Sequence, residues 1–280
     1  KIDLLKAESI GDLIHAETEL QRDQAVKLVQ GNASNYYNDL REKLIKSLSY
    51  IEAKIDFAED DLPEKVLKEV QNSIKEIHKD INKIIEDNKI GEKIRDGFRV
   101  SITGEVNAGK SSLLNLIAKR DVAIVSDEAG TTRDVIETYL NIDGYPVILA
   151  DTAGIRAAKN EVEKKGISLA LGKSKEADLN IVVIDNSSKS INSKIKKIIN
   201  KDTIVLLNKS DVLNKQNHKF DADTVLASVK ENKNIDILIK KIKEKLSKKF
   251  KYNNTALITR ERHRVKLNEC LKEIDNFLKK

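Results

Sequence analysis

The sequence predicts an α/β domain with a mainly parallel sheet that is inserted into an all-α domain. Residues 1–95 carry apolar side chains at helical spacing and almost no strand signal. Residues 96–250 instead alternate short apolar strands with helix-like stretches, a pattern typical of a parallel sheet covered by helices. Residues 251–280 return to helical spacing, and a single helix there cannot bury its apolar face alone. We therefore expect 251–280 to complete the helical domain that 1–95 begins.

Three long helices are expected in the first 95 residues. Their apolar stripes run over residues 2–14, 40–55 and 66–84. Pro63 suits the first position of the third helix, because no N–H is needed there. A last stripe runs over residues 267–278 and includes Cys270, which we interpret as core packing rather than as chemistry.

The composition excludes a disulfide-stabilised protein and a protein with membrane-spanning helices. The 280 residues include one cysteine, so an internal disulfide is impossible, and no apolar run approaches the roughly 20 residues that cross a bilayer. We expect a cytoplasmic protein without a membrane partner. Because the chain starts at Lys1 and has no methionine, we interpret it as a fragment of a longer product.

The net charge of +6 is unevenly spread along the chain. Residues 238–280 hold 14 Lys and Arg against 5 Asp and Glu. A basic stretch of this kind could bind RNA, or it could be the solvated face of a helix. The sequence leaves both interpretations open.

A phosphate-binding loop, GEVNAGKS at residues 104–111, lies between an expected strand at 98–102 and an expected helix at 112–117. In such a loop the backbone N–H groups and the positive end of the following helix surround phosphate groups. Lys110 reaches the β- and γ-phosphate oxygens, and the Ser111 hydroxyl is offered to Mg²⁺. The motif and its setting therefore predict a P-loop nucleotide-binding domain.

Two further segments supply groups for the γ-phosphate and its metal. An apolar strand at 146–150 ends in Asp151-Thr152-Ala153-Gly154, where Asp151 can hold Mg²⁺ through water and the Gly154 N–H faces the γ-phosphate. Residues 130–134, GTTRD, supply threonines for Mg²⁺ and the γ-phosphate.

The base is predicted by a third segment. An apolar strand at 203–207 ends in NKSD, residues 208–211, so that the Asp211 carboxylate can accept hydrogen bonds from N1–H and the amine of guanine. Adenine presents no such pair of donors. The strand and loop at 225–230 can then close over the base. Together these segments predict a GTPase, with GTP and GDP as ligands.

The chain resembles the MnmE (TrmE) tRNA-modification GTPases over essentially its whole length. Four segments carry the resemblance: the helical opening 1–14, the loop 104–112, AGTTRD at 129–134 and DTAGIR at 151–156. The resemblance implies a K⁺-stimulated GTPase that acts with MnmG, an FAD-dependent partner. The pair would modify C5 of the wobble uridine of tRNA with a group of the carboxymethylaminomethyl type.

Two parts of that family are expected outside this chain. A domain before Lys1 would bind a folate one-carbon donor and form a constitutive homodimer. A cysteine-containing tail would follow Lys280. The resemblance also implies that two G domains pair transiently.

The resemblance assigns the attacking water to Glu163. The position directly after Gly154 is Ile155, which cannot orient water, and Glu161 is the competing carboxylate. The implied K⁺ ligands are Asn107, Ser126, Glu128 and Thr131; the Mg²⁺ ligands are Ser111, Thr132 and Asp151; and the catalytic residues are Lys110, Thr132 and Glu163. The expected GTP contacts are Asn107, Ala108, Gly109, Lys110, Ser111, Ser112, Thr131, Gly154, Asn208, Lys209, Asp211, Ser228, Val229 and Lys230.

The sequence departs from the usual family pattern at a few positions. Glu105 and Val106 replace the more familiar Arg-Pro, Glu128 occupies a usually apolar position, and Val229 stands where alanine is common. Two rival interpretations are a ribosome-assembly GTPase and a scaffold that senses GTP without turning it over. The first would carry an RNA-binding βα domain after residue 250, where this chain has only a helix.

Overall fold

A computed structural model of the protein describes residues 2–57, 64–87, 89–120, 137–151, 172, 174–188, 190–212, 220–250 and 257–279. The chain forms two compact units. The helical unit comprises Lys1–Ala16, Gln21–Arg95 and Tyr252–Lys280, and the α/β unit comprises Glu17–Leu20 and Asp96–Lys251. The predicted fold class, an α/β domain inserted into a helical domain, is confirmed.

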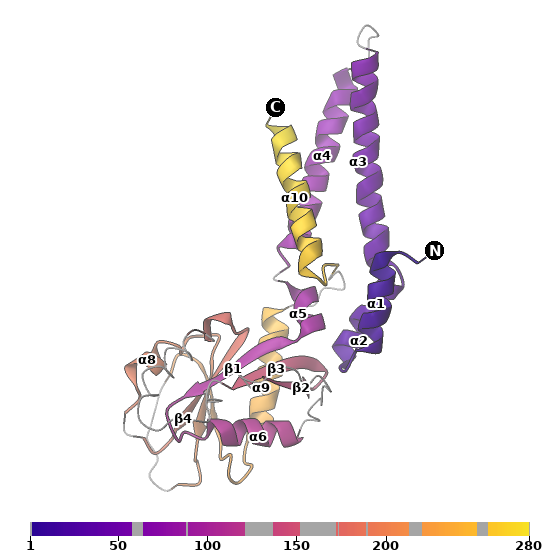
Figure 1. Ribbon diagram of the computed structural model, residues 1–280. Helices are drawn as coiled ribbons and strands as arrows, with labels where there is room; N and C mark the ends of the chain where they lie inside the picture. The colour runs from indigo at the N-terminus through magenta and orange to yellow at the C-terminus, as the bar shows by residue number, and fades with distance from the viewer. Residues whose placement is uncertain are drawn as a thin grey trace. The chain divides into compact units, whose positions relative to one another are not determined.

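The helical unit is built on three long helices. Its elements are α1 (Leu4–Ile14), α2 (Glu19–Val29), α3 (Asn32–Asp56), α4 (Glu64–Ile85), α5 (Ile90–Asp96) and α10 (Glu261–Leu278). Helix α4 packs against both α3 and α10, which runs alongside it in Figure 1. Ile77 and Ile81 of α4 share a core with Leu271 and Ile274 of α10, as the apolar stripes of these two helices require.

Helices α2 and α5 were not expected from the sequence. Helix α2 has little amphipathic character, and only Gln24, Ala25 and Leu28 are buried. It ends where the Gly31 N–H donates to the Leu28 carbonyl, and the positive φ of 96° at Gly31 suits glycine. Helix α3 then starts at Asn32, eight residues before the predicted stripe begins.

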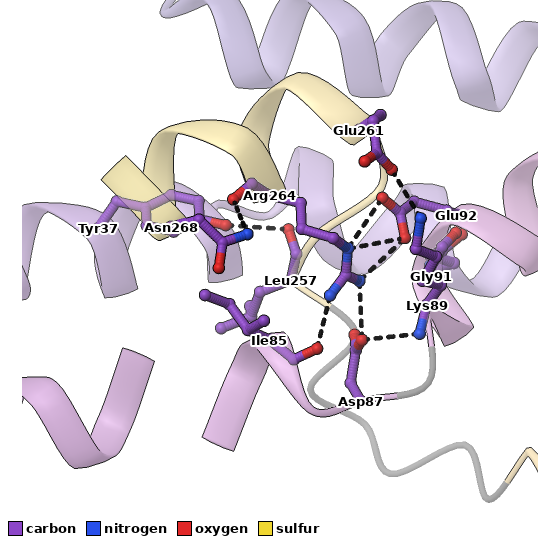
Figure 2. Close-up of polar contacts among 11 residues, drawn as sticks. Tyr37, Ile85, Asp87, Lys89, Gly91, Glu92, Leu257, Glu261, Arg264 and Asn268 are labelled. Atoms are coloured by element: carbon purple, nitrogen blue, oxygen red, sulfur yellow. Dashed lines mark hydrogen bonds and ion pairs between the residues drawn. The ribbon is translucent and has the colours of Figure 1, made fainter. Parts of the chain in front are cut away.

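A buried arginine connects the start of α10 to the end of α4 and to α5 (Figure 2). One guanidinium nitrogen of Arg264 lies 2.9 Å from both Glu92 Oε2 and Asp87 Oδ1, and another donates to the Ile85 carbonyl oxygen at 2.5 Å. The side chains of Arg264 and Glu92 are only 7% and 9% exposed. A single guanidinium group thus holds two carboxylates and a carbonyl oxygen from other segments.

Two helical glycines offer a matched test of packing in the helical unit. A Cβ at Gly91 would lie 2.2 Å from the Ile258 carbonyl oxygen, whereas a Cβ at Gly11 meets nothing within 4 Å. Gly91→Ala should therefore lower the free energy of unfolding by about 2 kcal/mol or more. Gly11→Ala should raise it by about 0.5–1 kcal/mol through helix propensity. Urea unfolding followed by circular dichroism measures both, and equal stabilities would contradict this packing.

The α/β unit contains one six-stranded sheet in the order β2-β3-β1-β4-β5-β6. Its elements are β1 (Phe98–Gly104), α6 (Lys110–Arg120), β2 (Glu137–Ile142), β3 (Tyr145–Asp151), β4 (Leu179–Asp185), α8 (Ser193–Lys196), β5 (Ile204–Asn208), β6 (Asp223–Leu226) and α9 (Ile235–Lys249). Only the β2–β3 pair is antiparallel among these strands. Helix α6 contacts β1 and β3, and α9 contacts β4 and β5.

The four central strands are parallel, so their carboxyl ends meet at one edge of the sheet. Gly104, Asp151, Asp185 and Asn208 are the last residues of β1, β3, β4 and β5. In open α/β sheets ligands bind outside this edge. The fold therefore brings the ends of the predicted site segments to the place where a ligand is expected.

Much of the basic excess near the carboxyl terminus is neutralised within its own unit. Lys241 and Lys245 both pair with Asp223, and Lys243 pairs with Asp143. In the helical unit Arg260 pairs with Asp12 at 2.8 Å. These pairs favour the solvated-face interpretation over an RNA surface for the side chains involved. None of the helices described is both long and apolar enough to cross a membrane.

Candidate nucleotide-binding site

The loop after β1 is shaped by two glycines that no other residue could replace without strain. Gly104 has a φ of 151°, and a Cβ there would lie 2.1 Å from the Val183 carbonyl oxygen of β4. Gly109 has a φ of 99°, and its Cβ would lie 2.2 Å from the Asn208 side chain. Asn107, between them, adopts a left-handed φ of 60°. The loop backbone thus packs closely against the ends of β4 and β5.

Lys110 begins α6 and folds back over this loop. Its ammonium group donates to the Glu105 carbonyl oxygen at 2.6 Å, and the Ala108 N–H reaches the same oxygen at 3.3 Å. Ser111 follows in the first turn of α6 with an exposed side chain. The start of α6 therefore brings together a cation, a hydroxyl and the backbone N–H groups of a helix N-terminus, the groups that bind phosphate and its metal.

Asn208 joins three segments of the site from a buried position. Its side-chain amide donates to the Ala108 carbonyl oxygen at 2.8 Å, and its side-chain oxygen accepts from the Val229 N–H at 3.0 Å. The side chain of Asn208 thereby fixes the phosphate loop and the 228–230 segment in one arrangement. The sequence predicted both segments as nucleotide contacts without predicting this connection.

The carboxylate of Asp211 is positioned by a hydrogen bond within the protein. Ser228, which is fully buried, donates its hydroxyl to Asp211 Oδ1 at 2.6 Å and accepts from the Glu231 N–H at 3.2 Å. The hydrogen bond from Ser228 holds the pKa of Asp211 below its usual range. Asp211 is therefore ionised at neutral pH and accepts hydrogen bonds only.

These residues surround a cavity of about 610 Å³. Eight of the expected GTP contacts line it: Asn107, Gly109, Ser112, Asn208, Lys209, Asp211, Val229 and Lys230. Four lining residues were missed: Asn115, Leu116, Lys119 and Val212. Three of them lie on the face of α6 that Ser112 begins, so helical spacing from the P-loop could have found them. A cavity of this volume suits a small-molecule ligand.

The remaining predicted residues divide into two groups. Lys110 and Ser111 lie beside the cavity at the start of α6, Ala108 contributes its carbonyl oxygen, and Ser228 acts on Asp211. Asp151 is the last residue of β3 and pairs in register with Ile102. Six predicted residues lie outside the part of the chain that the structure describes: Ser126, Glu128, Thr131, Thr132, Gly154 and Glu163.

Two of the three expected Mg²⁺ ligands, Ser111 and Asp151, lie within the described residues. A serine hydroxyl and an aspartate are oxygen ligands of the kind that Mg²⁺ prefers. Ser111 lies in the first turn of α6, and Asp151 is the last residue of β3. Of the expected K⁺ ligands only Asn107 lies within the described residues, where it lines the cavity and has a left-handed backbone conformation.

Comparison with known proteins gives a consistent assignment. The family profile described as "MnmE helical domain" matches residues 4–280. A Pelagibacter ubique protein described as "tRNA modification GTPase MnmE" is 55% identical over 286 residues, covering 100% of this chain and 64% of that protein. A Rickettsia bellii protein with the same description is 42% identical, covering 99% of this chain and 64% of that protein. The chain thus spans about 64% of the length of these relatives.

Two solved structures are similar to parts of the chain. The G domain of the T. maritima FeoB iron transporter is 23% identical, with a TM-score of 0.39, and covers 53% of this chain and 98% of its own. A GTP-binding protein of Sulfolobus solfataricus in complex with GDP is 18% identical, with a TM-score of 0.41. The match covers 88% of this chain and 73% of that protein's chain. Because the family profile spans nearly all 280 residues, this chain belongs to the MnmE family, as its motifs predicted.

Proposed function

We propose that the chain binds guanine nucleotides in the 610 Å³ cavity and hydrolyses GTP to GDP and phosphate. The observation that carries this proposal is the joining of two recognition elements in one site. The phosphate loop and the base-recognition segment at 208–211 line the same cavity, and Asn208 hydrogen-bonds directly to the loop. Asp211 is ionised and held by Ser228, so its carboxylate can accept hydrogen bonds from the N1–H and the amine of guanine.

In this proposal the phosphates lie on the loop and the start of α6. Backbone N–H groups of residues 105–110 and the positive end of α6 stabilise their negative charge, and Lys110 contacts the β- and γ-phosphate oxygens. Ser111, Thr132 and Asp151 would hold Mg²⁺, which supplies charge neutralisation at the β- and γ-phosphates. Thr131 and the Gly154 N–H would face the γ-phosphate.

Hydrolysis requires a positioned water and further positive charge. We assign the water to Glu163, since Ile155 offers no polar group at the position after Gly154. Asn107, with Ser126, Glu128 and Thr131, would hold K⁺ against the phosphates. The relatives named tRNA modification GTPases support a role in tRNA modification rather than in ribosome assembly.

The longer protein would carry the remaining activity. By analogy with its family we infer a cytoplasmic protein that works with an MnmG-like FAD protein on C5 of the wobble uridine of tRNA. A folate one-carbon donor and a homodimer contact would involve residues before this chain. A second dimer contact would form transiently between G domains.

A comparison of GTP hydrolysis in KCl and NaCl tests the catalytic proposal. Turnover should be much faster in K⁺, because the smaller Na⁺ fits the same oxygen ligands poorly. Asn107→Ala should remove that difference and leave GDP binding largely intact. The assay needs several protein concentrations, since the K⁺ site is expected only when G domains pair. Absence of multiple turnover in KCl at every concentration would favour the GTP-sensing scaffold instead.

A further inference from the structure

We propose that Asp185, the last residue of β4, is a positioning residue that holds Lys209 in the wall of the cavity and so sets the affinity for the guanine base. The inference rests on the proposed function. It goes beyond it because Asp185 is not among the expected nucleotide contacts and does not line the cavity. Asp185 acts only through the side chain of Lys209.

Lys209 occupies a backbone conformation that is costly for a non-glycine residue. Its φ is 63°, in the left-handed region, directly after the fully paired strand β5. Its ammonium nitrogen lies 2.6 Å from Asp185 Oδ2, and the two side chains are 36% and 22% exposed. Strain of this kind persists where surrounding contacts impose it, and this ion pair is one such contact.

Asp185 is itself held firmly. Its Oδ1 accepts from the Ser187 N–H at 2.9 Å and from the Ser187 hydroxyl at 2.6 Å, which leaves Oδ2 for Lys209. Asp185 pairs in register with Asn208, and the Asn186 N–H donates to the Asn208 carbonyl oxygen at 2.9 Å. Burial acts to raise the pKa of Asp185, but the hydrogen bonds from Lys209 and Ser187 outweigh it and the pKa is lowered.

This arrangement divides the Lys209 side chain into two parts. The ammonium group is bound to a carboxylate that lies outside the cavity lining, while the residue itself lines the cavity. The methylene stem is therefore the part available as an apolar wall for a planar base. Without Asp185 the ammonium group loses its partner, and the stem must be ordered when the ligand binds. Asp211, two residues further on, is the alternative carboxylate to which the ammonium could turn, at the expense of guanine recognition.

The test is Asp185→Asn, which keeps the shape and the bonds to Ser187 but removes the charge. We expect GDP to bind up to about tenfold more weakly, the cost of ordering one long side chain when the ligand binds. Inorganic pyrophosphate, which has no base, should compete for the site as well as it does in the unmodified chain. The matched control is Asp223→Asn, which removes a carboxylate paired with Lys241 and Lys245 away from the cavity. It should leave GDP affinity unchanged.

A double-mutant cycle separates positioning from a general structural effect. In the background of Lys209→Met, Asp185→Asn should have no further effect on GDP affinity, because its only route to the base is gone. Three results would overturn the inference. Asp185→Asn could bind GDP as tightly as the unmodified chain does, it could lose affinity equally for GDP and pyrophosphate, or the losses in the cycle could be additive. If the unmodified chain bound no GDP, the proposed function would fail as well; if it did bind GDP, these results would count against Asp185 alone.

Discussion

Replacing Asp211 with asparagine should move the specificity of the site from guanine to xanthine nucleotides. The carboxylate accepts from both N1–H and the amine of guanine, whereas an asparagine amide matches the carbonyl that xanthine carries in place of the amine. A site built to hydrogen-bond a group rejects analogues that lack it, commonly on the order of 10⁴-fold. The expected result is a loss of that size in GDP affinity with a gain for XDP.

Titration with fluorescent GDP, with GDP, XDP and ADP as competitors, measures this change. Ser228→Ala is the graded control, because it removes the hydrogen bond that orients Asp211 but leaves the carboxylate in place. Its GDP affinity should fall by about tenfold or less and its preference for guanine should persist. If ADP and GDP bound the unmodified chain equally well, the base assignment would be wrong.

Replacing Arg264 with methionine should destabilise the helical unit by about 3–5 kcal/mol. The substitution leaves Glu92 and Asp87 without the cation that both contact, and it frees the Ile85 carbonyl oxygen (Figure 2). Glu92 is almost fully buried, so its charge cannot be solvated in place. The cost is that of breaking a buried pair, which exceeds the net contribution of the pair when both partners are present.

Arg262→Met provides the matched control on the same helix. Arg262 contacts Glu8, but its side chain is 52% exposed, so its loss should cost about 1 kcal/mol or less. Urea unfolding followed by far-ultraviolet circular dichroism compares the two variants. A double variant, Arg264→Met with Glu92→Gln, should recover part of the stability. If Arg264→Met and Arg262→Met lowered the free energy of unfolding equally, the buried cluster would contribute no more to stability than an exposed ion pair does.

The sequence predicts those parts of the site whose residues follow one another along the chain. The phosphate loop and the 208–211 segment have local spacing that their chemistry imposes, and the cavity lies between them. Asp185 and Ser228 act through contacts with segments that follow other strands, Asp185 with Lys209 and Ser228 with Asp211. No local pattern marks the Asp185 contact, because an aspartate at the end of an apolar strand is ordinary in any α/β sheet.

The fold shows the same division between local and long-range information. The long amphipathic helices α3, α4 and α10 carry clear apolar stripes and were predicted, although α3 starts earlier than its stripe. Helix α2 was missed because its mixed polar surface gives no strong period. In the sequence Arg264 cannot be told from a surface cation, because the sequence is rich in lysine. Its burial and its pairing with Glu92 follow from the packing of α10 against the end of α4 and α5.

The central claim is that a guanine nucleotide binds with its phosphates on residues 104–111 and its base beside Asp211. A crystal structure of the chain with GDP and Mg²⁺ tests it most directly. The claim predicts density for the base between Lys209 and the α6 face that carries Asn115, with both carboxylate oxygens of Asp211 within hydrogen-bonding distance of guanine. A nucleotide bound elsewhere on the chain, or a base turned away from Asp211, would contradict it.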